Sequence, residues 1–355
     1  MIIQFSIITF ILSVVTEFFV IRFCHKHSLY DSLGSRKIHT GNIPRLGGIA
    51  IAVSFFVGFI LYSFFHHQGV ETSYIFLLAS GLIIFVVGVV DDLIELSAKK
   101  KLFAQLVATI ILVVGGFKFN RIFVFDLEQN AFLLVFSYLV TFVWIVGVIN
   151  AYNLIDGLDG LCGSITFVTF ITYGFIYYRT VPRVAAVFFI LAAAILGFLV
   201  FNWPPAKVFM GDNGSTFLGF SVVAFALYTE QDVNTSMTVY EFTKILVLLN
   251  LTAIPVTDTL AAVWRRTRDH RPIMSPDKSH IHHKLLNIGF SKTGVLYLLL
   301  SIQILVCISV YVSTLLTKVQ STVLLSVTYL LVLLFFAWIH YANRRANRRK
   351  AVAEQ

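Results

Sequence analysis

Charged residues are scarce in this chain. Asp, Glu, Lys and Arg together make up 13% of its 355 residues, whereas hydrophobic residues make up 58%. This balance excludes an ordinary soluble protein, whose surface needs far more charge. The three cysteines, Cys24, Cys162 and Cys307, have neither the spacing of a metal site nor that of a disulfide framework. No Pro-, Gly- or Ser-rich linker divides the sequence, so we expect one domain.

Long apolar runs take the place of the missing charge. Stretches of roughly 20 hydrophobic residues recur, and each is long enough to cross a ~30 Å hydrocarbon core as a helix. We therefore predict an all-α integral membrane protein with about eleven transmembrane helices. Their expected positions are residues 1–23, 46–65, 74–91, 102–117, 131–150, 161–178, 184–201, 215–229, 241–263, 294–316 and 321–342.

The two ends of the chain differ in character. The first apolar run has no basic start and no small-residue cleavage site, so we expect it to be retained as a helix. A single polytopic domain is predicted over residues 1–343, followed by a basic cytoplasmic tail at 344–355.

Between two spans, the partial alternation of Phe, Val and Ile in 115–130 predicts a short hairpin.

Lys and Arg are distributed unevenly between the two sets of loops. If the loop 24–45 lies inside and the sides then alternate, most of the 27 basic residues fall on the inside. Membrane proteins concentrate basic residues in their cytoplasmic loops, so we predict an outside N-terminus and a cytoplasmic C-terminus. The same rule accounts for the net charge of +9 without nucleic acid as a partner.

Four polar clusters stand at span ends, and the alternation puts all four on the cytoplasmic face. A carboxylate at a membrane boundary costs free energy unless a metal, a cation or water compensates it. Several clusters facing one compartment therefore predict a single site. The clusters are Asp91-Asp92, the segment from Asn153 to Asp159, the segment from Met210 to Ser215 around Asp212, and the basic run ending in His280, His282 and His283.

The adjacent carboxylates Asp91 and Asp92 point about 100° apart on a helix, yet both reach one cavity at its end. Such a pair suits a magnesium ion, or a division in which one carboxylate acts as a base while the other stays charged. A solvated helix end is the alternative. Lys101 is either a phosphate ligand or an anchor of its span at the membrane interface.

Asn153, Asp156 and Asp159 recur every three residues, which places them on one face of a helical turn. Their oxygen atoms suit magnesium, which usually shares its coordination with substrate phosphates. A turn rich in Asn, Asp and Gly is the alternative. Asp212 suits the same metal chemistry, although it or Ser215 also suits capping of the next helix.

The last large loop combines arginines with histidines. Arginines bind diphosphate through forked donors, and imidazoles donate to phosphate oxygens or take up a proton. The candidate residues are Arg265, Arg266, His280, His282 and His283. Zinc is not expected, because the H-x-H-H spacing lacks the context of familiar zinc sites.

These motifs together resemble the polyprenyl-phosphate N-acetylhexosamine-1-phosphate transferases. The matching segments are VVDD, NAYNLIDGLDGL, FMGDNGSTFLGF and SHIHHKLL, preceded by RKIHTGNIPRLGG, in this order from Arg36 to about Leu286. The sequence HIHH is similar to the WecA/TagO branch. The related MraY branch, which transfers phospho-MurNAc-pentapeptide, has a run of three histidines there, and Ile281 departs from it.

The resemblance implies transfer of a sugar-1-phosphate from a UDP-sugar, with UDP-GlcNAc as the usual donor, to undecaprenyl phosphate, with release of UMP. The lipid-linked product starts a cell-surface glycan such as O-antigen, enterobacterial common antigen or teichoic acid. The site is expected at the cytoplasmic face of a bacterial inner membrane, with Mg²⁺ as cofactor and Mn²⁺ as a second option. A homodimer is left open.

The resemblance also assigns roles to individual residues. It implies that Asp212, with Asn153, binds the metal and that Asp91 and Asp92 lie near the lipid phosphate. Asp156 and Asp159 match a second acidic motif with a catalytic role. The implied substrate ligands are Arg45, Lys101, Asn153, Arg265, Arg266, His280, His282 and His283.

Two reaction routes and one other class of protein stay open at this point. A lipid phosphate oxygen attacks the β-phosphorus directly, with Asp91 or Asp92 orienting it, or the reaction passes through a covalent aspartyl-phosphate. A secondary transporter is the alternative class. Transporters concentrate polar residues near the bilayer midplane, and here only Glu17 is an acidic residue well inside a span.

Overall fold

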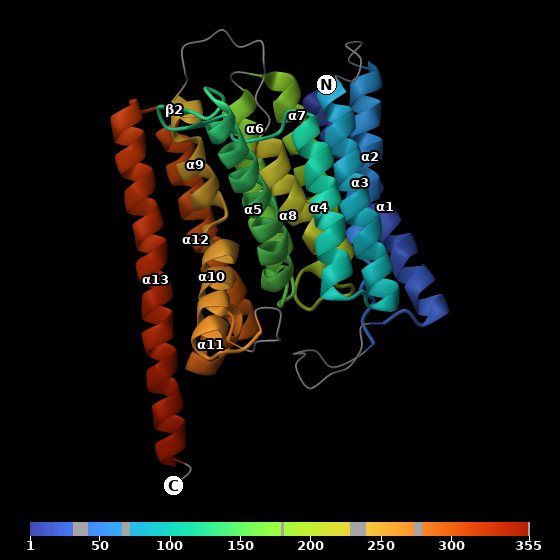
Figure 1. Cartoon of the computed structure of the whole chain (residues 1–355). Coiled ribbons are helices and arrows are strands. Elements are labelled where there is room, and N and C mark those ends of the chain that lie inside the picture. Colours follow the sequence, from blue (N-terminus) through green and yellow to red (C-terminus); the bar gives the residue numbers. More distant parts are fainter. Residues whose placement is uncertain (31–41, 66–71, 179–180, 228–238, 273–278, 354–355) are drawn as a thin grey trace.

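The computed structural model describes residues 1–30, 42–65, 72–178, 181–227, 239–272 and 279–353, and it is a bundle of helices (Figure 1). The helices are α1 (Ile2–His27), α2 (Gly48–Phe65), α3 (Thr72–Ile94), α4 (Ala98–Val114), α5 (Ala131–Ile155), α6 (Leu161–Tyr178), α7 (Pro182–Asn202), α8 (Gly211–Ala226), α9 (Val239–Leu251), α10 (Ala253–Arg268), α11 (Ile281–Ile288), α12 (Lys292–Ser313) and α13 (Lys318–Ala353). Two short strands, β1 (Arg121–Ile122) and β2 (Phe125–Asp126), pair antiparallel.

Each predicted span coincides with a helix or, in one case, a helix pair, so the all-α membrane architecture is confirmed. Within the described residues, eight helices are long and apolar enough to cross a membrane, and α9 with α10 makes a ninth candidate. The helices α4 and α8 have 17 and 16 residues and fall short of that length. The count of eleven crossings stays a prediction.

The predicted single span 241–263 is wrong in one respect. It is two helices, α9 and α10, which are bent by 72° at a break near Thr252. Pro255 has no N–H to donate to the carbonyl of Leu251, four residues earlier, so the helical hydrogen-bond pattern is interrupted. The Nε2 of Gln303, a fully buried residue of α12, donates to this carbonyl at 3.0 Å. The Leu251 carbonyl that the break leaves without a helical partner is therefore hydrogen-bonded inside the bundle.

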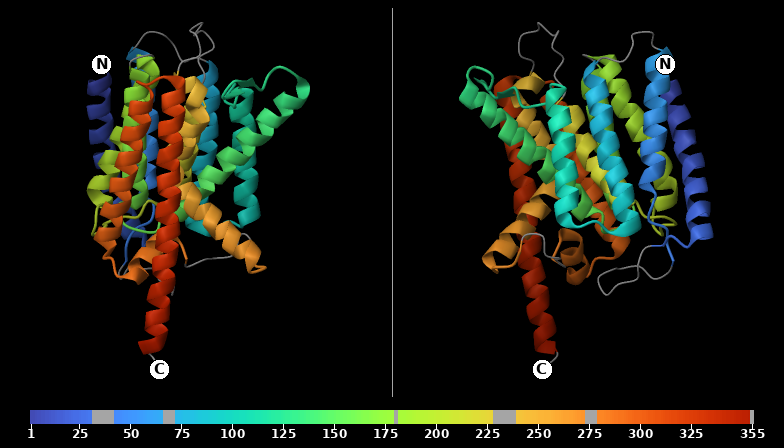
Figure 2. Two further views of the ribbon diagram at one scale, coloured as in Figure 1. Left: turned by 90° about the vertical axis from the view of Figure 1, so that its left-hand side faces the viewer. Right: turned by 45° about the vertical axis from the view of Figure 1, so that its right-hand side comes forward.

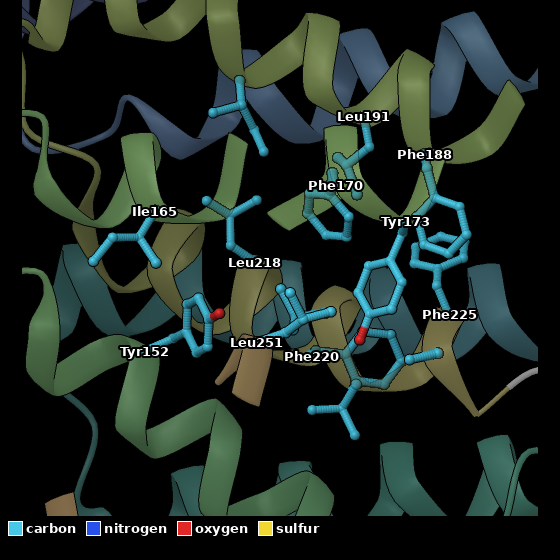
Figure 3. Close-up of a cluster of buried hydrophobic side chains, with 14 of the residues drawn as sticks. Tyr152, Ile165, Phe170, Tyr173, Phe188, Leu191, Leu218, Phe220, Phe225 and Leu251 are labelled. Atoms are coloured by element: carbon cyan, nitrogen blue, oxygen red, sulfur yellow. The ribbon is translucent and has the colours of Figure 1, made fainter. Parts of the chain in front are cut away.

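Helix α8 forms the centre of the bundle, and its residues from Asn213 to Ala226 are all buried. Figure 3 shows side chains of α5, α6, α7, α8 and α9 meeting around it. Among them, the rings of Tyr173 and Phe188 stack with centroids 5.0 Å apart. The outer helices α1 and α13 instead expose apolar side chains such as Ile3 and Val319, as expected for surfaces in lipid. The packing around α8 fixes where its N-terminus, and hence Asp212, lies.

Both ends of the bundle carry features that the sequence had indicated. The hairpin predicted in 115–130 is confirmed, with Arg121 opposite Asp126. At the other end, the predicted basic tail continues α13 as helix to Ala353 and extends beyond the bundle (Figure 2). Asn287 of α11 donates to the side chains of Asn343 and Asn347, which joins this extension to α11.

The four polar clusters lie at one end of the bundle, the end toward which α13 extends (Figure 1). This end holds the loops that follow α3, α5 and α7, together with α11. The prediction that the clusters share one face is therefore confirmed. The side of the membrane that this face occupies stays a prediction.

Candidate active site

A lysine joins two of the predicted clusters. Lys101, in the first turn of α4, donates from Nζ to Oδ2 of Asp91 at 2.5 Å and to Oδ2 of Asp212 at 2.9 Å. Asp91 comes from the last turns of α3, and Asp212 from the first turn of α8. Asp91 also accepts from the backbone N–H of Leu96. Three helices thus bring two carboxylates and one ammonium group to a single point.

Asp92 faces a different set of groups. Its carboxylate accepts from the backbone N–H groups of Asp212 and Asn213 at 3.1 and 2.9 Å, and from Nδ2 of Asn213 at 2.6 Å. Arg45 completes the set, with Nη2 3.0 Å from Oδ1 of Asp92. An anion favours the N–H groups exposed at a helix N-terminus. Asp92 is therefore the acceptor that holds the start of α8.

Gly211 permits this helix start. Its φ is +75°, a conformation that L side chains rarely adopt. A Cβ at this position would lie 2.2 Å from the backbone oxygen of Arg45 and 2.6 Å from Oδ2 of Asp92. The close approach of Arg45, Asp92 and α8 therefore requires glycine here.

Asn153, near the end of α5, reaches the same point. Its Nδ2 donates to Oγ of Ser215 at 3.1 Å, and its side chain is hydrogen-bonded to Asp212. In this arrangement the amide nitrogen faces Asp212. Coordination of a metal by Asn153 requires its carbonyl oxygen, and hence the opposite orientation of the amide.

The two other carboxylates of this segment belong to the loop after α5. Asp156 follows the last residue of α5 and is half-buried. Asp159 accepts from the backbone N–H of Ala206 at 3.1 Å and so ties its loop to the segment after α7. Next to it, Gly160 donates its N–H to Oδ1 of Asn202. Asp159 thus has a structural contact, whereas its catalytic role stays a prediction.

The three histidines form a group of their own beside the loop that follows α5. The rings of His280 and His282 are nearly parallel with centroids 6.0 Å apart, and those of His282 and His283 are 4.4 Å apart. His280 and His282 are buried, and His283 is half-buried. A Cβ on Gly157 would lie 2.5 Å from Nε2 of His282, so the loop after α5 and the histidine segment are in direct contact.

Arg265 and Arg266 stand in the last turn of α10, away from the Lys101 group. The Arg266 side chain is buried, whereas Arg265 is half-buried. Arg265 acts electrostatically on His340 together with Arg268, Lys284 and Arg344. Positive charge from α10, α11 and α13 therefore collects around His340 of α13.

The pKa values of Asp212 and His282, which lie outside the membrane spans, are both lowered. Burial acts to raise the pKa of Asp212, but hydrogen bonds with Asp91 and Lys101 and the Lys101 charge outweigh it and lower the pKa to about 2. Burial lowers the pKa of His282 to about 3, helped by the neighbouring His283. At neutral pH Asp212 is therefore an anion and His282 is uncharged.

A pocket opens beside the Lys101 group, between α3, α4 and α8. Its polar lining comes from Asp91, Lys101, Asp212, Gln105 and Thr216, and its apolar lining from Ile84, Val87, Gly88 and Ala104. The pocket therefore places one ammonium group and two carboxylates beside apolar side chains.

Several residues that hold the site together were not predicted from the sequence. Asp258 of α10 contacts His280, Asn213 contacts Asp92, and Asn202 contacts the loop at Gly160. Asp258 and Asn202 lie within apolar segments, where a polar side chain is itself a signal of a partner. Pro255 inside a predicted span was the available signal for the α9–α10 break.

Replacement of Gly157 by Ala tests the contact between the α5 loop and His282. We expect the added methyl group to overpack the contact and to lower the free energy of unfolding by about 1–3 kcal/mol, which lowers the unfolding midpoint. We also expect activity to fall about tenfold, because the His282 ring is displaced. Gly147→Ala is the matched control, because its Cβ meets nothing within 4 Å in an exposed part of α5. Thermal unfolding in detergent and an activity assay compare the two. If both variants have the same stability and the same activity, the contact between the α5 loop and His282 does not contribute to the site.

The fold and the site define a class: a polytopic membrane protein with carboxylates, a lysine and histidines gathered at one end of its bundle. The family model for glycosyl transferase family 4 matches residues 74–230. A Bacillus subtilis (strain 168) protein named "probable undecaprenyl-phosphate N-acetylglucosaminyl 1-phosphate transferase" is 32% identical over 338 residues, covering 94% of this chain and 90% of that protein. The chain belongs to glycosyl transferase family 4.

Relatives in other bacteria carry similar names. The undecaprenyl-phosphate alpha-N-acetylglucosaminyl 1-phosphate transferase of Yersinia pestis is 30% identical over 91% of this chain and 86% of its own length. A decaprenyl-phosphate N-acetylglucosaminephosphotransferase of Mycobacterium tuberculosis is 30% identical over 74% of this chain and 70% of its own length. The names share an N-acetylglucosamine phosphate group and a polyprenyl-phosphate acceptor.

Proposed function

We propose that this protein transfers N-acetylglucosamine-1-phosphate from UDP-GlcNAc to undecaprenyl phosphate and releases UMP. The observation that carries the proposal is the position of Lys101 between Asp91 and Asp212, at the charged end of a pocket with apolar walls. The names of the bacterial relatives support both the sugar and the polyprenyl acceptor. The MraY-like alternative is not favoured by these names, and neither is a transporter.

The donor set suits Mg²⁺. Among the described residues no group of three or more His, Cys, Asp or Glu is placed to hold a metal by itself. Magnesium does not need such a cage, because it commonly binds one or two carboxylates together with substrate phosphates. Asp212 and Asn153 would hold it, beside Asp91, at a point that already attracts the Lys101 ammonium. When bound, Mg²⁺ neutralises diphosphate charge and stabilises the departing UMP.

The chain's own residues bind and orient the reactants. Lys101 binds the lipid phosphate at the pocket and offsets its negative charge. The apolar lining from α3 and α4 contacts the first part of the hydrocarbon chain. A lipid phosphate oxygen attacks the β-phosphorus of the donor, the bond to UMP breaks, and UMP leaves with the electron pair. A phosphate monoester, with its second pKa near 6, is largely dianionic at pH 7, so little base catalysis is needed.

The histidine side receives the sugar nucleotide. His282 of α11 contacts Gly157 in the loop after α5, and basic groups of α10, α11 and α13 collect around His340. His283, the most exposed of the three imidazoles, is the best placed to meet the donor. His282 is uncharged and acts through a hydrogen bond or packing rather than as a cation.

The test is UMP release from UDP-GlcNAc by purified protein in detergent, with undecaprenyl phosphate and with or without Mg²⁺. We expect UMP only when both the lipid and the metal are present. A panel of other UDP-sugars tests donor choice, and absence of UMP with every donor refutes the enzyme proposal. UMP formed before lipid is added, with label trapped on the protein, would establish the covalent route in place of direct attack.

A further inference from the structure

An acidic residue outside the Lys101 group contacts the histidine segment. Asp258 lies in the second turn of α10, after the α9–α10 break, and it is 1% exposed. Its Oδ2 is 2.8 Å from Nδ1 of His280, and its Oδ1 accepts from the backbone N–H of Ile281 at 2.8 Å. Both carboxylate oxygens are therefore committed to the residues at which α11 begins.

The first contact fixes the proton on the His280 ring. A carboxylate accepts hydrogen bonds and does not donate them, so Nδ1 of His280 must carry a hydrogen. The other ring nitrogen, Nε2, is then the one that can accept a hydrogen bond or take up a proton. Asp258 would also stabilise the ring if it became an imidazolium. Without the Asp258 carboxylate, nothing in this contact would favour the His280 tautomer that is protonated on Nδ1.

The second contact fixes the start of α11. His280 occupies the N-cap position of this helix, and its own side chain makes no capping hydrogen bond. The Asp258 carboxylate supplies the missing acceptor from another helix. Because α11 carries His282 and His283 in its first turn, its starting point decides where both rings meet the Gly157 loop.

Capping alone does not account for an aspartate here. An asparagine would cap the N–H of Ile281 with its carbonyl oxygen and would cost less to bury than a carboxylate. What asparagine cannot do is accept from Nδ1 of His280 with its remaining NH₂ group. The carboxylate is required only if the tautomer of His280 matters.

We propose that Asp258 is a positioning residue, which sets the tautomer of His280 and the orientation of the histidine segment for the sugar-nucleotide side of the reaction. The inference rests on the proposed function for its catalytic consequence, although the tautomer itself does not depend on that function. The helix break near Thr252 contributes to this positioning, because it turns α10 so that Asp258 reaches the start of α11.

Asp258→Asn separates the two contacts. The Asn carbonyl keeps the cap on Ile281, but its NH₂ faces Nδ1 and shifts the hydrogen of His280 to Nε2. We expect an unfolding midpoint within a few degrees of the wild type, kcat lowered by at least ~100-fold, and KM for the donor changed by less than about threefold. Asp258→Ala removes both contacts, and we expect it to lower the midpoint as well. If Asp258→Asn retains wild-type kcat, or loses stability as Asp258→Ala does, the positioning role is refuted.

A double-mutant cycle and a spectrum provide independent readings. In a His280→Gln background, Asp258→Asn should cost little more activity; a full additional loss would contradict action through His280. ¹⁵N NMR of protein labelled at histidine should show a signal of an Nδ1-protonated ring in the wild type that changes to Nε2-protonated in Asp258→Asn. An unchanged spectrum also overturns the inference. If the wild type releases no UMP but the spectra change as expected, the proposed function fails while the positioning contact stands.

Discussion

Asp212→Asn should leave the protein folded and lower its rate of UMP release by about 10³-fold. Asp212 is the carboxylate on which Lys101, Asn153 and Asp91 converge, and its pKa of about 2 keeps it anionic. The asparagine has nearly the same volume, so packing around the first turn of α8 is preserved. It lacks the negative charge that would attract the proposed magnesium ion and that holds Lys101 at the end of the pocket.

The pH dependence of this variant follows from the sign of the shift. A lowered pKa means that the charge of Asp212 contributes to stability at every pH above the unfolded value near 4, and that this contribution is lost only as the pH falls through about 2. The activity loss of Asp212→Asn should therefore be the same at pH 6.5 and pH 8.5.

Asp269→Asn is the matched control for Asp212→Asn. Asp269 is an exposed residue just after α10, and its carboxylate pairs with the neighbouring Arg268. The same substitution at this surface position should leave activity within about twofold of the wild type. UMP release and thermal unfolding in detergent check both variants. Near-normal turnover of Asp212→Asn would remove Asp212 from the metal site.

The sequence was sufficient for the all-α membrane class and for the shared end of the bundle at which the polar clusters lie. Apolar runs are a local property, so they locate helices without knowledge of packing, and the alternation of successive helices groups their ends. Asp91 and Asp212 are 121 residues apart in the numbering, yet the alternation of spans predicted that they share one face. Their joint contact with Lys101 bears this out.

The pairing of individual side chains could not be predicted in this way. Asp91 and Asp92 are adjacent and chemically identical, and only the positions of α4 and α8 decide which faces Lys101 and which faces Arg45. The partner of Asp258 could not be predicted either, because His280 stands at the start of another helix. Pro255 was visible, but the consequence of its missing N–H depends on Gln303, 48 positions later, being buried beside it.

Asp91→Asn and Asp92→Asn should therefore fail in different ways. Asp91 lines the pocket and pairs with Lys101, so its amide variant should unfold within a few degrees of the wild type but release UMP at least ~100-fold more slowly. Asp92 accepts from Arg45, from two backbone N–H groups and from Asn213. An amide cannot accept from all of these donors, and we expect a loss of about 2–4 kcal/mol in stability.

The contrast between the two variants decides which carboxylate meets the lipid phosphate. Because Asp92 holds the start of α8, its variant should lose activity mainly through displacement of Asp212, and Mg²⁺ should raise its unfolding midpoint less than that of the wild type. Asp91→Asn should keep most of the magnesium effect, since Asp212 and α8 are unchanged. Thermal unfolding with and without Mg²⁺, alongside UMP release, measures both. If Asp92→Asn is as stable as Asp91→Asn and equally inactive, both carboxylates act on the substrate, and the division of roles assigned to them is wrong.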